Sequence, residues 1–104
     1  MENKLTIIVD GQNATLKKHG KIVKGTKGYL KCGILFSEEW DGINKVLVCS
    51  NTFDFSSETA TPIVNNSCMI PDSVTDRNRI FIKIIGKMSQ LKIVTNTCVL
   101  EQEG

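Results

Sequence analysis

Apolar side chains in this chain recur at every second residue, the spacing that places them on one face of a β-strand. The clearest case is the stretch 29–36, where Leu30, Cys32, Ile34 and Phe36 share one face. Residues branched at Cβ, which favour the pleated backbone, fill another strong candidate at 6–9. No long stretch has the helical period of 3.6 residues. The chain is therefore expected to fold into β-sheets.

Short strands separated by turn signals account for most of the sequence. The signals recur about every 8–12 residues, which is typical of a β-sandwich or barrel. We expect one unpatterned loop at 56–61, a tight hairpin around His19-Gly20, and a bend or bulge at Asn96. The strongest strand, 80–85, is expected to stop at Gly86. The candidate strands are 4–10, 15–18, 21–23, 29–36, 45–49, 52–55, 62–64, 68–70, 80–85, 90–95 and 97–101.

Two short helical turns are expected to interrupt the strands. Ser37 has a side chain that can accept hydrogen bonds from the following backbone N–H groups, as an N-cap does. Gly42 can adopt the left-handed conformation that ends such a turn, and the turn is expected to tuck Trp40 against the core. Pro71 is expected at the first position of the second turn, 71–74, where its missing N–H is harmless.

Length and charge limit the class of protein. The 104 residues match one domain spanning 1–104, long enough to form a core without staples. With 13 basic and 11 acidic residues, the net charge of +2 is too small to indicate nucleic acid or an anionic membrane as the main partner. No apolar run reaches the roughly 18–20 residues of a membrane span, and the N-terminus lacks the apolar core of a signal peptide. Synthesis and folding in a cytoplasm are therefore expected.

The residues that most often carry chemistry are sparse here. Cys32, Cys49, Cys68 and Cys98 are widely spaced, so no zinc or redox motif is formed. Free thiols in the core are expected, with one structural disulfide as the alternative. His19 is the only histidine and is interpreted as a solvated turn residue. We therefore expect no catalytic, metal-binding or cofactor-binding residues, and no enzymatic activity.

Two clusters of charged residues can be interpreted as either structural or functional. The carboxylates of Glu38, Glu39 and Asp41 surround Trp40, but without the spacing of a calcium loop or of a sugar-cleaving pair. A solvated turn explains them more simply. A lysine-rich stretch is interpreted as protection of a strand edge, with a docking face for an acidic protein as the alternative. Its lysines are Lys17, Lys18, Lys21, Lys24, Lys27 and Lys31.

A family resemblance is carried by the order of four short motifs. They are Phe36-Ser37-x-x-Trp40-Asp41-Gly42-x-x-Lys45, then Cys68-x-Ile70-Pro71-x-x-Val74, then Phe81-x-x-x-x-Gly86, and finally Lys92-x-x-Thr95-Asn96. In this order they resemble the small immunoglobulin-like β-sandwich modules of virion proteins (baseplate, tail-fibre or head-fibre proteins) from phages and prophages of Gram-positive bacteria. The resemblance covers about residues 29–100.

The resemblance implies an all-β, immunoglobulin-like antiparallel β-sandwich of about 7–9 short strands with one or two short helical turns. It implies architectural positions rather than binding residues. Trp40 would pack the first turn, Pro71 would end a short strand, and Asn96 would help to turn the chain into the last strand. The other structural positions of the set are Gly42, Phe81 and Gly86.

The function that the resemblance implies is a non-enzymatic structural or attachment module of a virion. It would dock on a capsid, tail or baseplate protein, and it would be made in the host cytoplasm before entering the virion. Self-association is left open. A phage-encoded inhibitor of a host defence protein is the alternative, because inhibition needs only a complementary surface. A carbohydrate-binding module has less support, because aromatic residues make up 6% and Trp40, Phe36 and Phe81 are expected in the core.

Replacing Trp40 tests the expected core. Trp40→Ala is expected to lower the free energy of unfolding by roughly 3–5 kcal/mol, through lost burial and the cavity left behind. Chemical denaturation of both proteins measures the difference. A loss below about 1 kcal/mol would instead place the indole at the surface and revive a role in stacking on a ligand.

Overall fold

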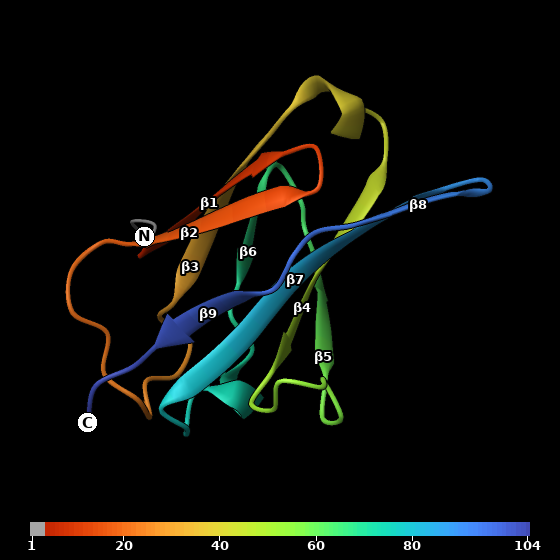
Figure 1. The fold of residues 1–104 in the computed structure, drawn as a ribbon. Coiled ribbons are helices and arrows are strands. Elements are labelled where there is room, and N and C mark those ends of the chain that lie inside the picture. Colours follow the sequence, from red (N-terminus) through yellow and green to blue (C-terminus); the bar gives the residue numbers. More distant parts are fainter. Residues whose placement is uncertain (1–3) are drawn as a thin grey trace.

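Strands make up most of the chain, as the alternating pattern predicts. The structure is a computed structural model that describes residues 4–104, which form nine strands and two 3₁₀ turns (Figure 1). The all-β architecture expected from the sequence is thereby confirmed. In chain order the elements are β1 (Leu5–Asp10), β2 (Asn13–Lys18), β3 (Lys31–Phe36), η1 (Glu38–Trp40), β4 (Asn44–Ser50), β5 (Thr59–Pro62), β6 (Ser67–Met69), η2 (Asp72–Val74), β7 (Arg79–Met88), β8 (Leu91–Val94) and β9 (Cys98–Glu101).

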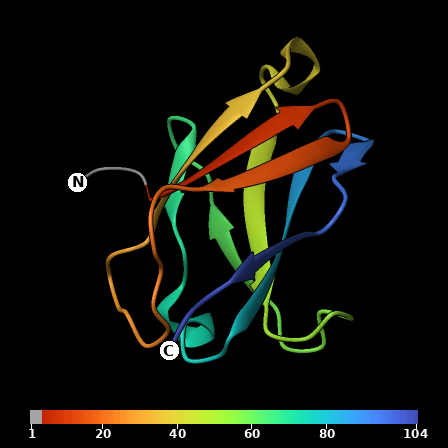
Figure 2. The ribbon, with the colours of Figure 1, turned by 60° about the vertical axis from the view of Figure 1, so that its left-hand side comes forward.

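Two sheets pack face to face (Figures 1 and 2). One has the order β2-β1-β3-β6, and the other has β5-β4-β7 followed by two strands that share β7. The first half of β7 pairs with β9 and its last residues pair with β8. Every pair is antiparallel except β1 and β3, which run parallel and so depart from the antiparallel sandwich expected. Such a pair needs a long connection, which β2 and the segment 19–30 supply.

The inward faces of both sheets form one core. Ile80, Ile82 and Ile84 of β7 are almost fully buried, as are Leu5 and Ile7 of β1. Each set has the period of two that a pleated strand requires. Burial of one such side chain is worth about 1.5–3 kcal/mol relative to exposure, so these faces hold the two sheets together.

Trp40 closes one end of this core. Its indole is fully buried, its Nε1–H donates to the Gly11 carbonyl at 2.8 Å, and its ring centroid lies 5.2 Å from that of Phe36. The ring also lies directly on β7, because a Cβ added at Gly86 would come within 2.6 Å of the indole and 2.8 Å of Ile43. Gly86 therefore provides the space that the indole occupies.

The two turns begin differently from expectation. Ser37 makes no side-chain cap for η1; its hydroxyl instead accepts from the Gly11 N–H at 3.0 Å and donates to Glu39. Gly42, just after η1, has a φ of 77°, in the left-handed region. Pro71 precedes η2 as its N-cap residue instead of occupying the first position of the turn.

Asn96 joins the two sheets at their edge. It lies between β8 and β9, and its amide pairs with the backbone of Ala14 in β2. The Ala14 N–H donates to Asn96 Oδ1 at 2.7 Å, and Asn96 Nδ2 donates to the Ala14 carbonyl at 3.1 Å. This side chain imitates a strand partner for β2, so it connects β2 to the other sheet.

Several expected strand boundaries were wrong. No hairpin forms around His19-Gly20; β2 pairs with β1 through the turn at Gly11, and the only strand pairing of 21–23 is one isolated bridge. Residues 52–55 form turns, whereas Thr59–Pro62 pairs with β4. Gly86 does not end its strand, because β7 continues to Met88. Turn residues in this chain mark bends but do not show which strands they connect.

The contact between Trp40 and Gly86 can be tested by adding one methyl group. Gly86→Ala is expected to lower the free energy of unfolding by about 1–3 kcal/mol, because the new Cβ overlaps the indole. Urea denaturation measures the loss. The loss is expected to shrink in a Trp40→Leu background, where the smaller side chain leaves room for the methyl. Equal losses in both backgrounds would contradict this explanation.

Candidate protein-binding surface

Phe81 lies on the outer face of its sheet, which corrects the expectation that it belongs to the core. Its neighbours Ile80 and Ile82 face inward and are fully buried, so the pleat turns Phe81 outward, where it is half-buried. The stretch 80–82 is apolar at every position, so alternation could not assign its faces. β7 lies in the middle of its sheet and is at least partly covered on both faces, which explains why residues 80–82 are all apolar.

Phe81 and two exposed neighbours, Phe53 and Val99, form a group of three side chains here called the apolar patch. Phe53 packs edge-on against Phe81 with ring centroids 5.7 Å apart, and Val99 lies directly opposite Phe81 on β9. Phe53 is 75% exposed and Val99 is 45% exposed. Isolated exposed apolar residues are ordinary, whereas a contiguous exposed apolar patch can mark an interaction site. The apolar patch is therefore a candidate contact for another protein.

The loop that carries Phe53 is anchored on the sheet. Phe55, two residues further, is buried with a φ of 58°, and the Lys83 ammonium lies 4.2 Å from the centroid of its ring. Val48 lies opposite Lys83 on the same face of the sheet and is almost fully buried. Phe53 is thus held outward by a fixed loop. Sequence reasoning missed it because 52–55 read as a weak strand.

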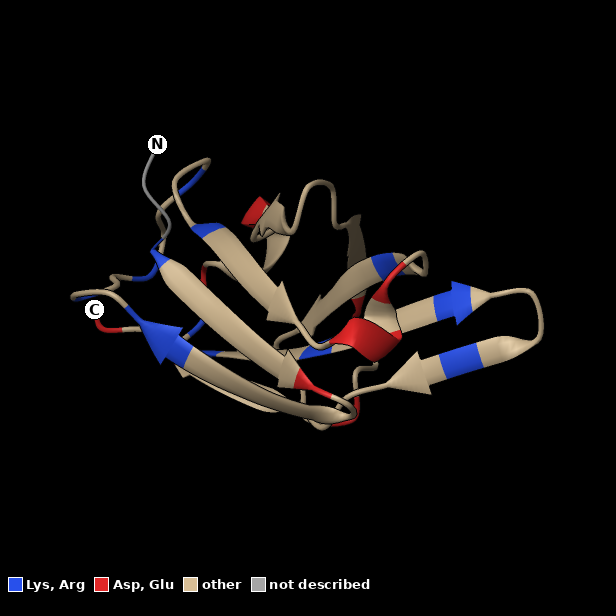
Figure 3. Ribbon diagram, turned by 90° about the horizontal axis from the view of Figure 1, so that it is seen from above, with Lys and Arg blue, Asp and Glu red and all other residues tan. Residues whose placement is uncertain are grey.

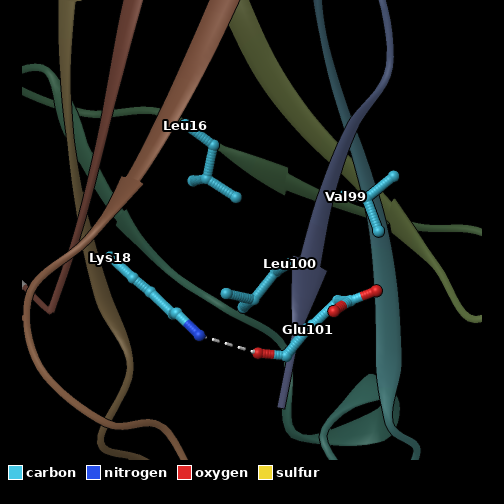
Figure 4. Close-up of a pocket in the computed structure, with 5 residues that line it drawn as sticks. All are labelled: Leu16, Lys18, Val99, Leu100 and Glu101. Atoms are coloured by element: carbon cyan, nitrogen blue, oxygen red, sulfur yellow. Dashed lines mark hydrogen bonds between the residues drawn. The ribbon is translucent and has the colours of Figure 1, made fainter.

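A groove runs beside the apolar patch, between β2 and β9 (Figure 4). Its volume is about 340 Å³, and its apolar lining comes from Leu16, Leu100 and Val99. Lys18 and Glu101 line the remainder, and the Lys18 ammonium donates to the Glu101 carbonyl at 3.4 Å. Val99 lines the groove and belongs to the apolar patch, and its side chain points away from Leu16 (Figure 4), so the two features meet at β9.

Backbone groups on both sides of the groove have no strand partner. The Ala14 N–H and C=O point away from β1 toward Asn96. Because backbone groups of every second residue in a strand point to the same side, the N–H and C=O of Leu16 and Lys18 also point away from β1. On β9, the Gln102 N–H donates to Asn78 next to β7, so alternation directs the backbone groups of Glu101 toward β2. No ladder joins β2 and β9. Such edges can pair with an extended segment of another chain.

Most of the lysine-rich stretch is engaged within the molecule. The Lys27 ammonium lies 3.0 Å from the Asp76 carboxylate and 2.8 Å from the Asp72 carbonyl. Lys24 donates to Asn78 at 3.0 Å, and Lys21 lies 3.7 Å from the Glu103 carboxylate. These contacts attach the long connection 19–30 to η2 and to the segments just before β7 and just after β9. They leave less free charge for the docking face considered above.

The histidine and the thiols are not arranged as a nucleophile and its base. His19 is exposed at the end of β2, with its Nε2 2.8 Å from the Thr6 hydroxyl. All four cysteines are free and buried, which confirms the expected core thiols. Cys32 lies opposite Cys68 on β6; a hydrogen bond with Cys68, followed by burial, raises the pKa of the Cys32 thiol. This raised pKa disfavours the reactive thiolate form of Cys32.

Among residues 4–104, no three His, Cys, Asp or Glu side chains are grouped so that they could hold a metal ion. In the same range, no helix has the length and apolar character that crossing a bilayer requires.

Comparisons of this chain with protein-family models, with curated proteins and with solved structures find no match. The resemblance to virion modules therefore stays an expectation based on the order of the sequence motifs.

The burial of Cys49 predicts how stability depends on pH. Burial, followed by the neighbouring Cys68, raises the pKa of Cys49 in the folded state. Above about pH 8.5 the unfolded thiol loses its proton while the folded one keeps it, so stability falls by about 1.4 kcal/mol per pH unit for this group. Below that pH the Cys49 thiol is protonated in both states, so it causes no loss of stability.

Urea denaturation between pH 7.5 and 9.5 measures this slope. Cys49→Ala, which removes the titrating group, is expected to show a shallower fall than the parent chain. Identical slopes in the two proteins would contradict the assignment to Cys49.

Proposed function

We propose that this chain is a non-enzymatic protein-binding module. Its partner would contact the apolar patch of Phe53, Phe81 and Val99 together with the adjoining groove. The observation that carries this proposal is the continuity of exposed apolar side chains with unpaired strand edges. Apolar contacts supply affinity in such a surface, and backbone pairing at an edge supplies orientation.

The sequence motifs support a more specific partner. Their order resembles virion modules of phages and prophages, so we propose a capsid, tail or baseplate protein as the partner and a structural or attachment role in the virion. Trp40, Gly42 and Gly86 from these motifs lie at one end of the sandwich, around η1 and β7. They serve the architecture there, whereas the apolar patch is built mainly from residues outside the motifs.

The geometry of the patch favours a protein over a small ligand. The groove is a shallow channel between two strand edges, and Phe53 projects from an anchored loop beside it. A protein surface can cover both features at once. Aromatic residues that pack edge-on and stand exposed on a rigid support are typical anchors at the centre of an interface.

Capture experiments with the intact chain test the proposal. The immobilised chain is incubated with a lysate of the bacterium that encodes it after prophage induction, and retained proteins are identified by mass spectrometry. A capsid, tail or baseplate protein is expected. Phe53→Ser and Val99→Ser are each expected to weaken its binding about tenfold or more, because each removes a central apolar contact.

Leu35→Ser is the matched control. Leu35 is an exposed apolar residue on the outer face of the other sheet, so its replacement should leave binding unchanged. Retention of a nuclease or nucleotide-signalling protein of the host, in place of a virion protein, would favour the inhibitor and overturn the virion role. Binding of a virion protein that is insensitive to both patch variants would overturn the assigned surface.

A further inference from the structure

The hairpin formed by β7 and β8 extends beyond the rest of the sandwich (Figure 1). The last pairing of β7 with β4 joins Lys87 to Asn44, so 88–91 have no strand beside them except their own hairpin. All six residues from 87 to 92, here called the arm, are exposed. The arm consists of the ends of β7 and β8 and the tight turn between them, in which Ser89 has a φ of 57°.

The arm has one apolar and one basic face. Met88 and Leu91 lie opposite each other, are 48% and 46% exposed, and share the face of Gly86 that packs on Trp40. This face continues the core face past the point where the opposite sheet ends. On the other face, Lys87 lies directly opposite Lys92, and such a pair of like charges is destabilising. An acidic partner would offset this repulsion.

The same end of the molecule carries an acidic segment. Glu38, Glu39 and Asp41, here called the acidic turn, flank Trp40, whose indole contacts Gly86 at the base of the arm. Figure 3 shows acidic colour on this turn and basic colour on both strands of the arm. Within the described residues, none of these five charged side chains makes an ion pair, although ion pairs form elsewhere.

We propose that the arm binds the acidic turn of a second copy of this chain. Lys87 and Lys92 of one copy would face the acidic turn of its partner, while Met88 and Leu91, on the opposite face of the arm, take no part in this contact. This inference rests on the arm and the acidic turn alone and does not depend on the proposed function.

The arrangement suits a two-fold dimer. Because each copy presents its arm and its acidic turn at one end, a two-fold axis there lets both arms engage at once, and the contact closes without further copies. The surface of two short arms and two turns is small compared with a standard interface, so a weak dimer is expected. Its electrostatic part should weaken as salt screens the charges.

Analytical ultracentrifugation of the purified chain tests the proposal. At low salt and about 100 µM protein, dimers are expected, and raising the salt should shift them toward monomer. The double variant Lys87→Glu with Lys92→Glu should weaken dimerisation at least tenfold. Lys17→Glu with Lys31→Glu makes the same charge change away from the arm and should leave the dimer intact.

A charge swap separates direct pairing from a general charge effect. One chain carries Lys87→Glu with Lys92→Glu, and the other carries Glu38→Lys with Glu39→Lys. Each chain alone should be monomeric, because its arm and its turn then have the same sign. Their mixture should form heterodimers, in which both contacts again join opposite charges. Thermal melting of each variant confirms that the fold is retained.

A parent chain that stays monomeric at low salt would overturn the proposal. So would dimers that persist unchanged in the arm variant, or a mixture of the swapped chains that fails to associate although both are folded. Loss of binding to a virion protein would not affect this inference, and loss of dimerisation would not affect the proposed function.

Discussion

Packing of the Trp40 indole against Gly86 is the interaction on which the architecture depends. It joins three parts of the chain that no strand ladder connects at this end: η1, the turn between β1 and β2, and β7. The indole occupies the space in which any other residue at position 86 would place its Cβ. A large side chain at position 40 therefore requires glycine at position 86. Because the indole also donates to Gly11, the apolar and polar demands of its burial are met together.

The other constraint is that β7 has two partners on the same edge. Between β8 and β9 the chain leaves the sheet, and Thr95 fills the break with its hydroxyl, which accepts from the Ile84 N–H at 3.0 Å. Asn96 then reaches across to β2, and beyond β9 the backbone of Glu103 pairs with Ile22 and Lys24. The sandwich is joined at both ends of this edge and left open between them. The groove is the opening that remains.

The sequence predicted the all-β class and the burial of Trp40, because both follow from local patterns. Alternation in 29–36 identified Leu30, Cys32 and Ile34 as buried, and the structure agrees. It failed at 80–82, where both faces are apolar, and so placed Phe81 in the core.

The candidate surface could not be predicted for a related reason. Phe53 and Val99 are far apart in the sequence, and only the pairing of β7 with β9 and the anchored loop bring them together. Nor do turn residues reveal a parallel pair such as β1 and β3, since that pairing depends on the path of the whole chain. Local chemistry set the elements, while their partners were set by contacts distant in sequence.

The pairing of Asn96 with Ala14 has a consequence for how the protein is made. The strand edge near the start of the chain meets its partner only when residues more than eighty positions later have emerged from the ribosome. Until then the β2 edge at Ala14 lacks its partner and is open to other nascent chains, and the apolar interior of its sheet lacks the strands that complete the cover. Folds that depend on such distant pairings form slowly. Synthesis of this protein should therefore pass through a vulnerable interval that ends only with its last strand.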